Sequence, residues 1–208
     1  EDVEASFPGS PLRWVKQIEQ LGTGHAVAQA MPSIDNNSVV LILYGDVPLI
    51  KASTLKAMIE DVSEDQMSLL TVDLKNPAGY GRIVRDDNNS VAAIVEQKEA
   101  TPDQLALTET NTGIMAVSAQ QLSTWLPALS NSNTQGEYYL TDIIAMAAAA
   151  GVTVKAFHPD TEAEVQGVND RVQLANLERE FQADKALQLL LQGVSLRDPK
   201  RLDIRGEL

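Results

Sequence analysis

The sequence of 208 residues contains no cysteine and only two histidines, His25 and His158. Disulfide bonds and thiolate metal sites are therefore impossible, and the chain is compatible with a reducing compartment. A zinc site built from several histidines is nearly excluded as well. Any metal site in this chain is expected to use oxygen ligands.

Positive charge is scarce. The chain has 16 Lys and Arg against 29 Asp and Glu, which gives a formal net charge of −13 at pH 7. Nucleic acids and anionic membranes both need a basic face, so neither is expected as the main partner. The net negative charge is compatible with a small phosphorylated ligand, because a divalent cation and backbone amides can neutralise the charge of such a ligand locally.

Long apolar runs and an N-terminal signal-peptide pattern are also lacking. The longest apolar runs, residues 39–44 and 143–150, are far too short to span a membrane. Hydrophobic residues form 44% of the chain and charged residues 22%, which is typical of a globular protein. We expect a soluble protein without a membrane partner. Because the chain begins with Glu1, we also expect it to be one piece of a longer chain.

Strand and helix patterns alternate along the chain and predict an α/β domain with a mixed sheet. A continuous apolar run at 39–44 predicts a strand buried on both faces. Further strands are expected at 67–74, 112–117 and 152–157, and a hairpin at 83–84 and 91–95. Helices are expected at 24–31, 53–62 with Ser53 as N-cap, 118–126 with Ser118 as N-cap, and 142–150.

The longest helix is predicted at 171–192 and ends at Gly193. Its apolar stripe is expected to contain Leu174, Leu177 and Phe181. The remaining residues, 193–208, are too few for a packed unit of their own and look like a connector.

The first candidate site is Tyr44-Gly45-Asp46, directly after the most apolar predicted strand. Ligands of open α/β sheets bind beyond the carboxyl ends of strands. Gly45 lets backbone approach closely, and Asp46 supplies a hard oxygen suited to Mg²⁺ and phosphate. The alternative is an ordinary turn in which the Asp caps the next element.

A second candidate is Leu21-Gly-Thr-Gly-His25, just before a predicted helix. Its amides could hold an anion or the edge of a base, although structural turns outnumber ligand loops among such matches. His25 is expected to be a hydrogen-bonded helix residue rather than a general base.

Several weaker signals each have a structural alternative, which is a turn, a solvated side chain or a helix cap. For Asn169 and Asp170 that alternative is the N-cap of the long helix. These signals are Gly79-Tyr-Gly-Arg82, Glu96, Asn111-Thr-Gly113, Gly136-Glu-Tyr-Tyr139 and Val168-Asn169-Asp170.

The motifs in their order are more specific than any one of them. The set is Leu21-Gly-Thr-Gly-His25, Leu43-Tyr-Gly-Asp-Val-Pro-Leu49, Gly79-Tyr-Gly-Arg-Ile83, Val95-Glu96, Asn111-Thr-Gly-Ile114, Gln135-Gly-Glu-Tyr-Tyr-Leu-Thr-Asp142 and Gly167-Val-Asn169. From about Trp14 to Leu208 the chain resembles the uridyltransferase domain of the bacterial bifunctional N-acetylglucosamine-1-phosphate uridyltransferase/glucosamine-1-phosphate N-acetyltransferase family.

The resemblance implies a Rossmann-like nucleotidyltransferase fold with a mixed sheet, followed by a long linker helix. It implies a cytoplasmic enzyme that joins UTP and N-acetylglucosamine 1-phosphate, with Mg²⁺, to give UDP-N-acetylglucosamine and pyrophosphate. That product serves the synthesis of cell-envelope precursors for peptidoglycan and lipopolysaccharide. Two alternatives remain: a related nucleotidyltransferase acting on another sugar or base, and a non-catalytic chain that at most binds UDP-sugar.

The resemblance also assigns site residues by motif. Asp46 and Asn169 are expected to hold Mg²⁺ and to act in catalysis. The uridine end is expected at Gln17, Gly22 and Thr23, with Tyr44 and Gly45 beside it, and the sugar pocket at Gly81, Glu96 and Asn111.

One large departure concerns the start of the family pattern. The family opens with a Gly-rich loop, Leu-Ala-Ala-Gly-x-Gly-Thr-x-Met, and a following lysine, neither of which occurs in this chain. The domains expected are a partial uridyltransferase domain at 1–170, a linker helix at 171–192, and at 193–208 the entry to an absent left-handed β-helix domain. We therefore expect low activity and a monomer, whereas the full-length family protein is expected to be a homotrimer through that β-helix.

Overall fold

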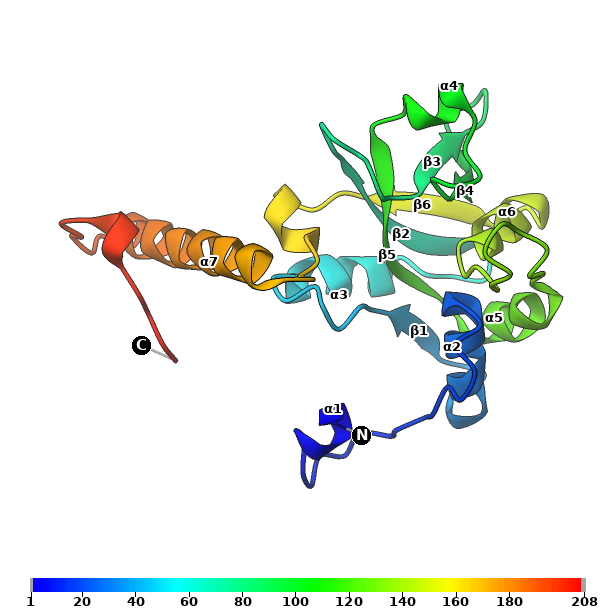
Figure 1. Cartoon of the computed structure of the whole chain (residues 1–208), viewed down its shortest axis with the longest axis horizontal. Helices are drawn as coiled ribbons and strands as arrows, with labels where there is room; N and C mark the ends of the chain where they lie inside the picture. The colour runs from blue at the N-terminus through cyan, green and yellow to red at the C-terminus, as the bar shows by residue number, and fades with distance from the viewer. Residues whose placement is uncertain (1, 207–208) are drawn as a thin grey trace.

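The computed structural model of the chain describes residues 2–206. Helices cover both faces of a six-stranded mixed sheet, and one long helix projects from this body (Figure 1). The predicted α/β architecture is therefore confirmed. No helix within 2–206 combines the length and the apolar character needed to cross a membrane.

The sheet is built around its longest strand, β5 (Glu109–Ser118). β5 pairs antiparallel with β1 (Val39–Ile42), β2 (Gln66–Asp73) and β3 (Arg82–Arg85). The sheet is completed by β4 (Val91–Val95), antiparallel to β3, and β6 (Thr153–Phe157), parallel to β2. The strand order is β4-β3-β5-β2-β6, with β1 attached to β5.

The main helices lie close to their predicted positions. Those within the body are α2 (Thr23–Ala30), α3 (Ala52–Glu60), α5 (Ala119–Trp125) and α6 (Asp142–Ala149). The projecting helix is α7 (Arg171–Leu191). Two short helices, α1 (Asp2–Ala5) and α4 (Pro102–Leu105), were not predicted, nor were the 3₁₀ turns Met31–Ser33, Leu126–Ala128, Glu162–Val165 and Pro199–Arg201.

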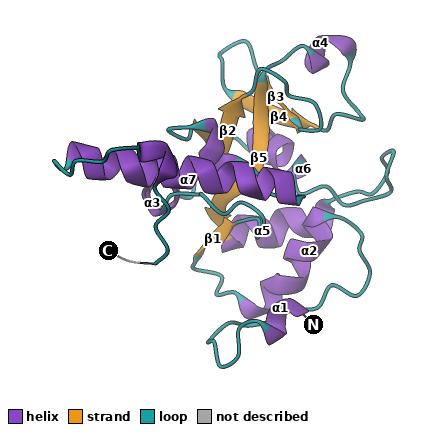
Figure 2. Cartoon of the chain, turned by 60° about the vertical axis from the view of Figure 1, so that its left-hand side comes forward, coloured by secondary structure: helices purple, strands orange, loops and turns teal. Residues whose placement is uncertain are grey.

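Two apolar clusters lie on opposite faces of the sheet. On one face, β2 and β5 contribute Met67, Leu69, Met115 and Val117, which pack with side chains of α2, α5 and α6. On the other face, α3 and the 3₁₀ turn Glu162–Val165 cover the second cluster. Figure 2 shows the strands edge-on between these helices. Because both faces are buried, loops at the strand ends are the surfaces left for ligands.

β1 is less buried than its sequence predicts. A strand covered on both faces was expected, but Val39 is 39% exposed and residues 40–42 are only half-buried. The physical reason is position, because within residues 2–206 β1 pairs only with β5 and its other edge has no strand neighbour.

The two predicted N-caps have different outcomes. Ser118 accepts a hydrogen bond from the Gln121 amide at the start of α5, which confirms it as a cap. Ser53 is not the cap of α3, because the helix begins one residue before it, at Ala52, and Lys51 occupies the N-cap position.

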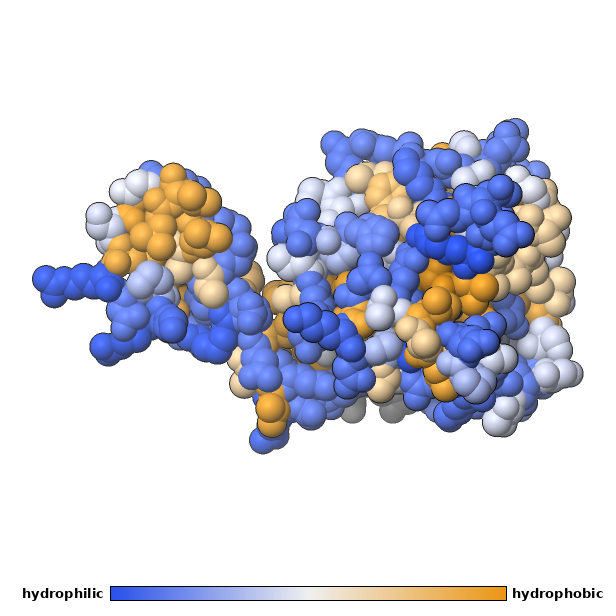
Figure 3. Space-filling model, turned by 90° about the horizontal axis from the view of Figure 1, so that it is seen from above, coloured by the Kyte–Doolittle hydropathy of each residue, from blue (hydrophilic) through white to orange (hydrophobic). Residues whose placement is uncertain are grey.

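The apolar stripe predicted on α7 is only partly correct. Leu177 is 1% exposed, whereas Leu174 and Phe181 are 52% and 38% exposed. The reason is that α7 projects from the body, so a full stripe has nothing to pack against (Figure 1). Figure 3 shows apolar surface on this projecting part. The residues after α7 fold back along it, where Gln182 exchanges two hydrogen bonds with the Ile204 backbone, at 3.0 and 2.8 Å.

Candidate functional site

The loop after β1 lies directly against the segment that precedes α7. The Val168 amide donates to the Asp46 carbonyl at 2.8 Å. A Cβ added to Gly167 would lie 3.5 Å from Oδ2 of Asp46, so the carboxylate faces this segment. Asp46 and Asn169 therefore belong to two chain segments that are far apart in sequence and adjacent in space.

Oxygen atoms of both side chains are available to a cation. Asp46 and Asn169 are exposed, and within residues 2–206 neither side chain makes a hydrogen bond or an ion pair. The described residues hold no cluster of three or more His, Asp or Glu side chains suited to a metal. One carboxylate and one amide oxygen fit Mg²⁺, which keeps several waters and binds phosphates through its remaining positions.

The N-cap of α7 is Asp170 and not Asn169. Oδ1 of Asp170 accepts from the amides of Val172 and Gln173, both at 2.8 Å. The backbone amide of Asn169 donates to Oε1 of Gln173 at 2.6 Å, and the Asn169 side chain makes no hydrogen bond to the described residues. The alternative role as a helix N-cap, considered for both Asn169 and Asp170, therefore applies to Asp170 alone.

Tyr44 packs on the backbone of β5. A Cβ on Gly113 would lie 2.1 Å from Cε2 of Tyr44, so the ring occupies the space that only a glycine leaves open. Burial raises the pKa of the Tyr44 hydroxyl above its ordinary value, and the negative charges of Glu96 and Asp46 raise it further. The hydroxyl stays protonated at neutral pH and can donate a hydrogen bond.

Gly81, Glu96 and Asn111 meet where β3, β4 and β5 lie side by side. The Asn111 amide donates to the Gly81 carbonyl at 3.0 Å. A Cβ on Gly81 would lie 3.6 Å from both oxygens of Glu96, so this glycine leaves the carboxylate accessible from that side. Oε1 of Glu96 accepts from the Thr141 hydroxyl at 2.9 Å.

A second group forms around the loop before α2. Nε2 of Gln17 donates to the Gly22 carbonyl at 3.1 Å, and Oγ1 of Thr23 accepts from the Leu140 amide at 3.1 Å. Gly22 has a φ of +102°, and an added Cβ would lie 2.8 Å from the Tyr138 carbonyl. The close approach of another backbone therefore requires glycine at this position.

Residues 138–141 join the two groups. The Tyr138 backbone pairs with Leu21 and Gly24, at 2.8 and 2.9 Å. Three residues later, Thr141 contacts Glu96. The structure thus gathers Tyr44, Asp46, Gly81, Glu96, Asn111 and Asn169 into one region, and connects Gln17, Gly22 and Thr23 to it through this segment.

Three positions of structural importance were not identified from the sequence as site residues. Gly113 and Thr141 lie inside motifs that the sequence analysis quotes, so the residue type at each position was the signal that could have identified it. Glu164 is 1% exposed, and its carboxylate accepts from the Thr54 hydroxyl at 2.5 Å and from the amides of Lys51 and Asp160 at 3.3 and 3.2 Å. Glu164 thus connects the end of the Asp46 loop to the segment that leads to Asn169. No local sequence pattern predicts this role.

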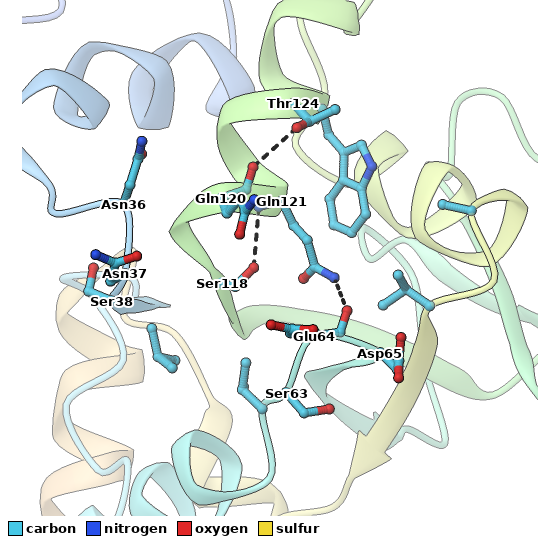
Figure 4. Close-up of a pocket in the computed structure, with 15 residues that line it drawn as sticks. Asn36, Asn37, Ser38, Ser63, Glu64, Asp65, Ser118, Gln120, Gln121 and Thr124 are labelled. Carbon is cyan, nitrogen blue, oxygen red and sulfur yellow. Dashed lines mark hydrogen bonds between the residues drawn. The ribbon is translucent and has the colours of Figure 1, made fainter.

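A cavity away from these residues lies in another part of the described chain. It has a volume of about 700 Å³ and lies at the opposite end of β1, between the residues before β2 and the start of α5 (Figure 4). Gln121 crosses it and donates to the Glu64 carbonyl at 2.8 Å. None of the site residues predicted from the sequence lines this cavity.

Residues 11–174 match the model of the nucleotidyl transferase family. This match covers most of the chain and contains every site residue predicted above. The chain belongs to the nucleotidyl transferase family. The expected class of enzyme and the expected fold are confirmed at the level of this family.

A curated relative supports the narrower resemblance. Over all 208 residues the chain is 57% identical to the "Bifunctional protein GlmU" of Marinobacter nauticus. The chain spans about half the length of this relative, 46%. The similarity to the bifunctional family, stated from the ordered motifs, is therefore confirmed.

Proposed function

We propose that this chain carries a site for uridylyl transfer from UTP to N-acetylglucosamine 1-phosphate, which yields UDP-N-acetylglucosamine and pyrophosphate. The observation that supports it most strongly is the meeting of Asp46 with the 167–169 segment, beside Tyr44, Glu96 and Asn111. The 57% identity with a bifunctional GlmU protein agrees with this proposal. We further propose cytoplasmic location and residues 1–170 as the transferase unit, with α7 as a linker.

The proposed reaction needs no covalent enzyme intermediate. A phosphate oxygen of the sugar phosphate attacks the α-phosphorus of UTP and forms a new P–O bond. The bond from the α-phosphorus to the bridging oxygen breaks, and its electron pair leaves with pyrophosphate. Catalysis then consists of positioning the two phosphates and balancing their charge.

Asp46 and Asn169 would hold Mg²⁺ through their free oxygen atoms, and the bound ion would supply positive charge to the phosphates. Because one ligand is a carboxylate and the other a neutral amide, they would neutralise only part of the positive charge of the ion. A full set of carboxylates would instead neutralise the ion before any phosphate reached it.

Glu96 and Asn111 are prepared to recognise sugar hydroxyls and amides. Thr141 occupies Oε1 of Glu96, which leaves Oε2 as an acceptor. Oδ1 of Asn111 accepts from the Gly113 amide at 2.9 Å, so the Nδ2 group of Asn111 is turned away from that bond and can donate. An acceptor and a donor held by the protein in fixed directions favour a polar sugar.

Calorimetric titration with UDP-N-acetylglucosamine, with and without Mg²⁺, tests the proposed site. We expect binding that tightens with Mg²⁺ and that weakens in Glu96→Gln. Binding without any pyrophosphate release from UTP and N-acetylglucosamine 1-phosphate would favour the non-catalytic alternative. Equal binding of UDP-glucose, with no loss in Glu96→Gln, would contradict the assigned sugar pocket.

A further inference from the structure

The buried carboxylate of Glu164 lies between two chain segments. Its side chain is 1% exposed and belongs to the 3₁₀ turn Glu162–Val165. One oxygen, Oε1, accepts from the Lys51 amide at 3.3 Å and from the Thr54 hydroxyl at 2.5 Å. The other oxygen, Oε2, accepts from the Asp160 amide at 3.2 Å. Glu164 therefore bonds the start of α3 with one oxygen and its own loop with the other.

The start of α3 depends on this carboxylate. Lys51 occupies the N-cap position, and its side chain makes no capping hydrogen bond. Glu164 accepts instead from the Lys51 amide and from Thr54 at the third helical position, although it lies 113 positions away from Lys51. A glutamate that accepts from the N-cap amide is one half of a capping box, and a carboxylate is favoured at the N-terminus of a helix. Glu164 thus supplies the side-chain cap that α3 lacks locally.

The two segments that Glu164 joins also carry the proposed ligands of Mg²⁺. Asp46 lies five residues before Lys51, and Asn169 lies five residues after Glu164. Beyond Glu164, the Val168 amide donates to the Asp46 carbonyl at 2.8 Å. Two polar bridges, one at each end, therefore hold these segments side by side.

Apolar contact also joins the two segments but fixes their position less closely. Val47 and Val165 belong to the same buried cluster. Apolar attraction is not directional, so packing of this kind tolerates small shifts. Hydrogen bonds to both oxygens of Glu164 set a distance and a direction on each side.

We propose that Glu164 is a positioning residue that holds Asp46 and Asn169 at the separation that Mg²⁺ requires. Mg²⁺ demands near-ideal octahedral geometry, so a small displacement of one ligand segment weakens its binding. This inference rests on the proposed function, with the ion at Asp46 and Asn169. Glu164 itself touches neither the ion nor a substrate in this account.

Calorimetric titration with UDP-N-acetylglucosamine tests the inference without any turnover, in the protein that carries this chain. The quantity compared is the Mg²⁺-dependent gain, which is the Kd without Mg²⁺ divided by the Kd with Mg²⁺. Glu164→Ala should lower this gain about 10-fold, the lower end of the losses seen when residues behind metal ligands are changed. The Kd without Mg²⁺ should stay within about 2-fold, because the proposed base and sugar contacts lie on other segments.

Glu164→Gln separates the roles of the two oxygens. Glutamine keeps one acceptor oxygen for the start of α3, but it places an NH₂ group opposite the Asp160 amide, where two donors meet. The gain should therefore fall in this variant as well, by less than in Glu164→Ala.

Asp61→Asn is the matched control. Asp61 lies at the opposite end of α3, where its carboxylate accepts from Gln66 and from Lys155, both at 2.6 Å. This variant loosens the same helix away from the two bridges, so its gain should equal that of the wild type.

A merely structural role would reduce the number of binding sites per chain and leave the gain of the folded protein unchanged, which would overturn the proposal. If Glu164→Ala fails to fold, as judged by its thermal unfolding midpoint, Glu164→Gln decides by the same ratio. An equal loss of gain in Asp61→Asn would also overturn it, since any loosening of α3 would then suffice. A wild-type protein that shows no gain from Mg²⁺ would refute the proposed metal site, whereas a gain that no Glu164 variant alters refutes this inference alone.

Discussion

Replacing Gly113 by alanine should displace Tyr44 from the site. Gly113 has a φ of +81°, and an added Cβ would lie 2.1, 2.7 and 2.9 Å from three atoms of the Tyr44 ring and hydroxyl. Real Cβ atoms do not approach carbon atoms this closely, so the ring must move. The backbone of β5 is held by its neighbours β1, β2 and β3 and cannot move as easily.

The expected cost has two parts. Alanine at a positive φ costs about 1–2 kcal/mol. Loss of Tyr44 packing adds about 1–2 kcal/mol, because this ring is partly exposed and loses only part of its burial. Gly151→Ala is the matched control, since Gly151 has a φ of +77° and nothing within 4 Å of its Cβ position. The control should show the backbone part alone.

Urea unfolding of both variants measures these costs, and a Tyr44→Ala background separates them. Without the ring, Gly113→Ala should cost no more than Gly151→Ala. Transferase activity of Gly113→Ala should fall about 10-fold or more, because Tyr44 would leave its place beside Glu96 and Asp46. Equal unfolding costs for Gly113→Ala and Gly151→Ala with Tyr44 present would refute the packing argument.

Three further predictions follow from the site and the sheet. Asp46→Asn should lower turnover strongly and leave the unfolding free energy nearly unchanged, because the carboxylate is exposed. Unchanged activity of this variant at limiting Mg²⁺ would show that Asp46 is not a metal ligand. Asp170→Ala should cost about 1 kcal/mol in urea unfolding, whereas Asn169→Ala should weaken Mg²⁺-dependent activity with little loss of stability; the reverse pattern would exchange their roles. Burial acts to raise the pKa of Glu109, but hydrogen bonds from Arg85 and Thr71 outweigh it and hold that pKa below its ordinary value. A lowered native pKa means that stability is present above the unfolded pKa and is lost as pH falls through the native pKa, so unfolding measured from about pH 6 to pH 3 should show a loss that Glu109→Gln lacks.

The fold was largely predictable because its signals are local. The apolar runs of β2 and β5, the Ser118 cap and the glycine after α6 each depend on a few neighbouring residues. The burial of β1 was not predictable in this way, because it depends on which strand lies beside it. The same holds for α7, whose exposed Leu174 and Phe181 follow from its projection away from the body.

The candidate site shows the same limit. Motifs identified the residue types at Asp46, Glu96, Asn111 and Asn169, but their assignment to Mg²⁺ and sugar stays a prediction. The contacts that organise them join residues far apart in sequence, such as Glu164 with Thr54, which are 110 positions apart. The choice between Asn169 and Asp170 as cap also needed coordinates, since either residue type can cap a helix.

Formation of UDP-N-acetylglucosamine from UTP and N-acetylglucosamine 1-phosphate tests the central proposal most directly. The protein that carries this chain should be incubated with both substrates, and the product identified by chromatography and mass. We predict that UDP-N-acetylglucosamine and pyrophosphate form in equal amounts, only with Mg²⁺, and much more slowly in Asp46→Asn. Absence of this product, or its formation at the same rate in Asp46→Asn, would contradict the proposed site.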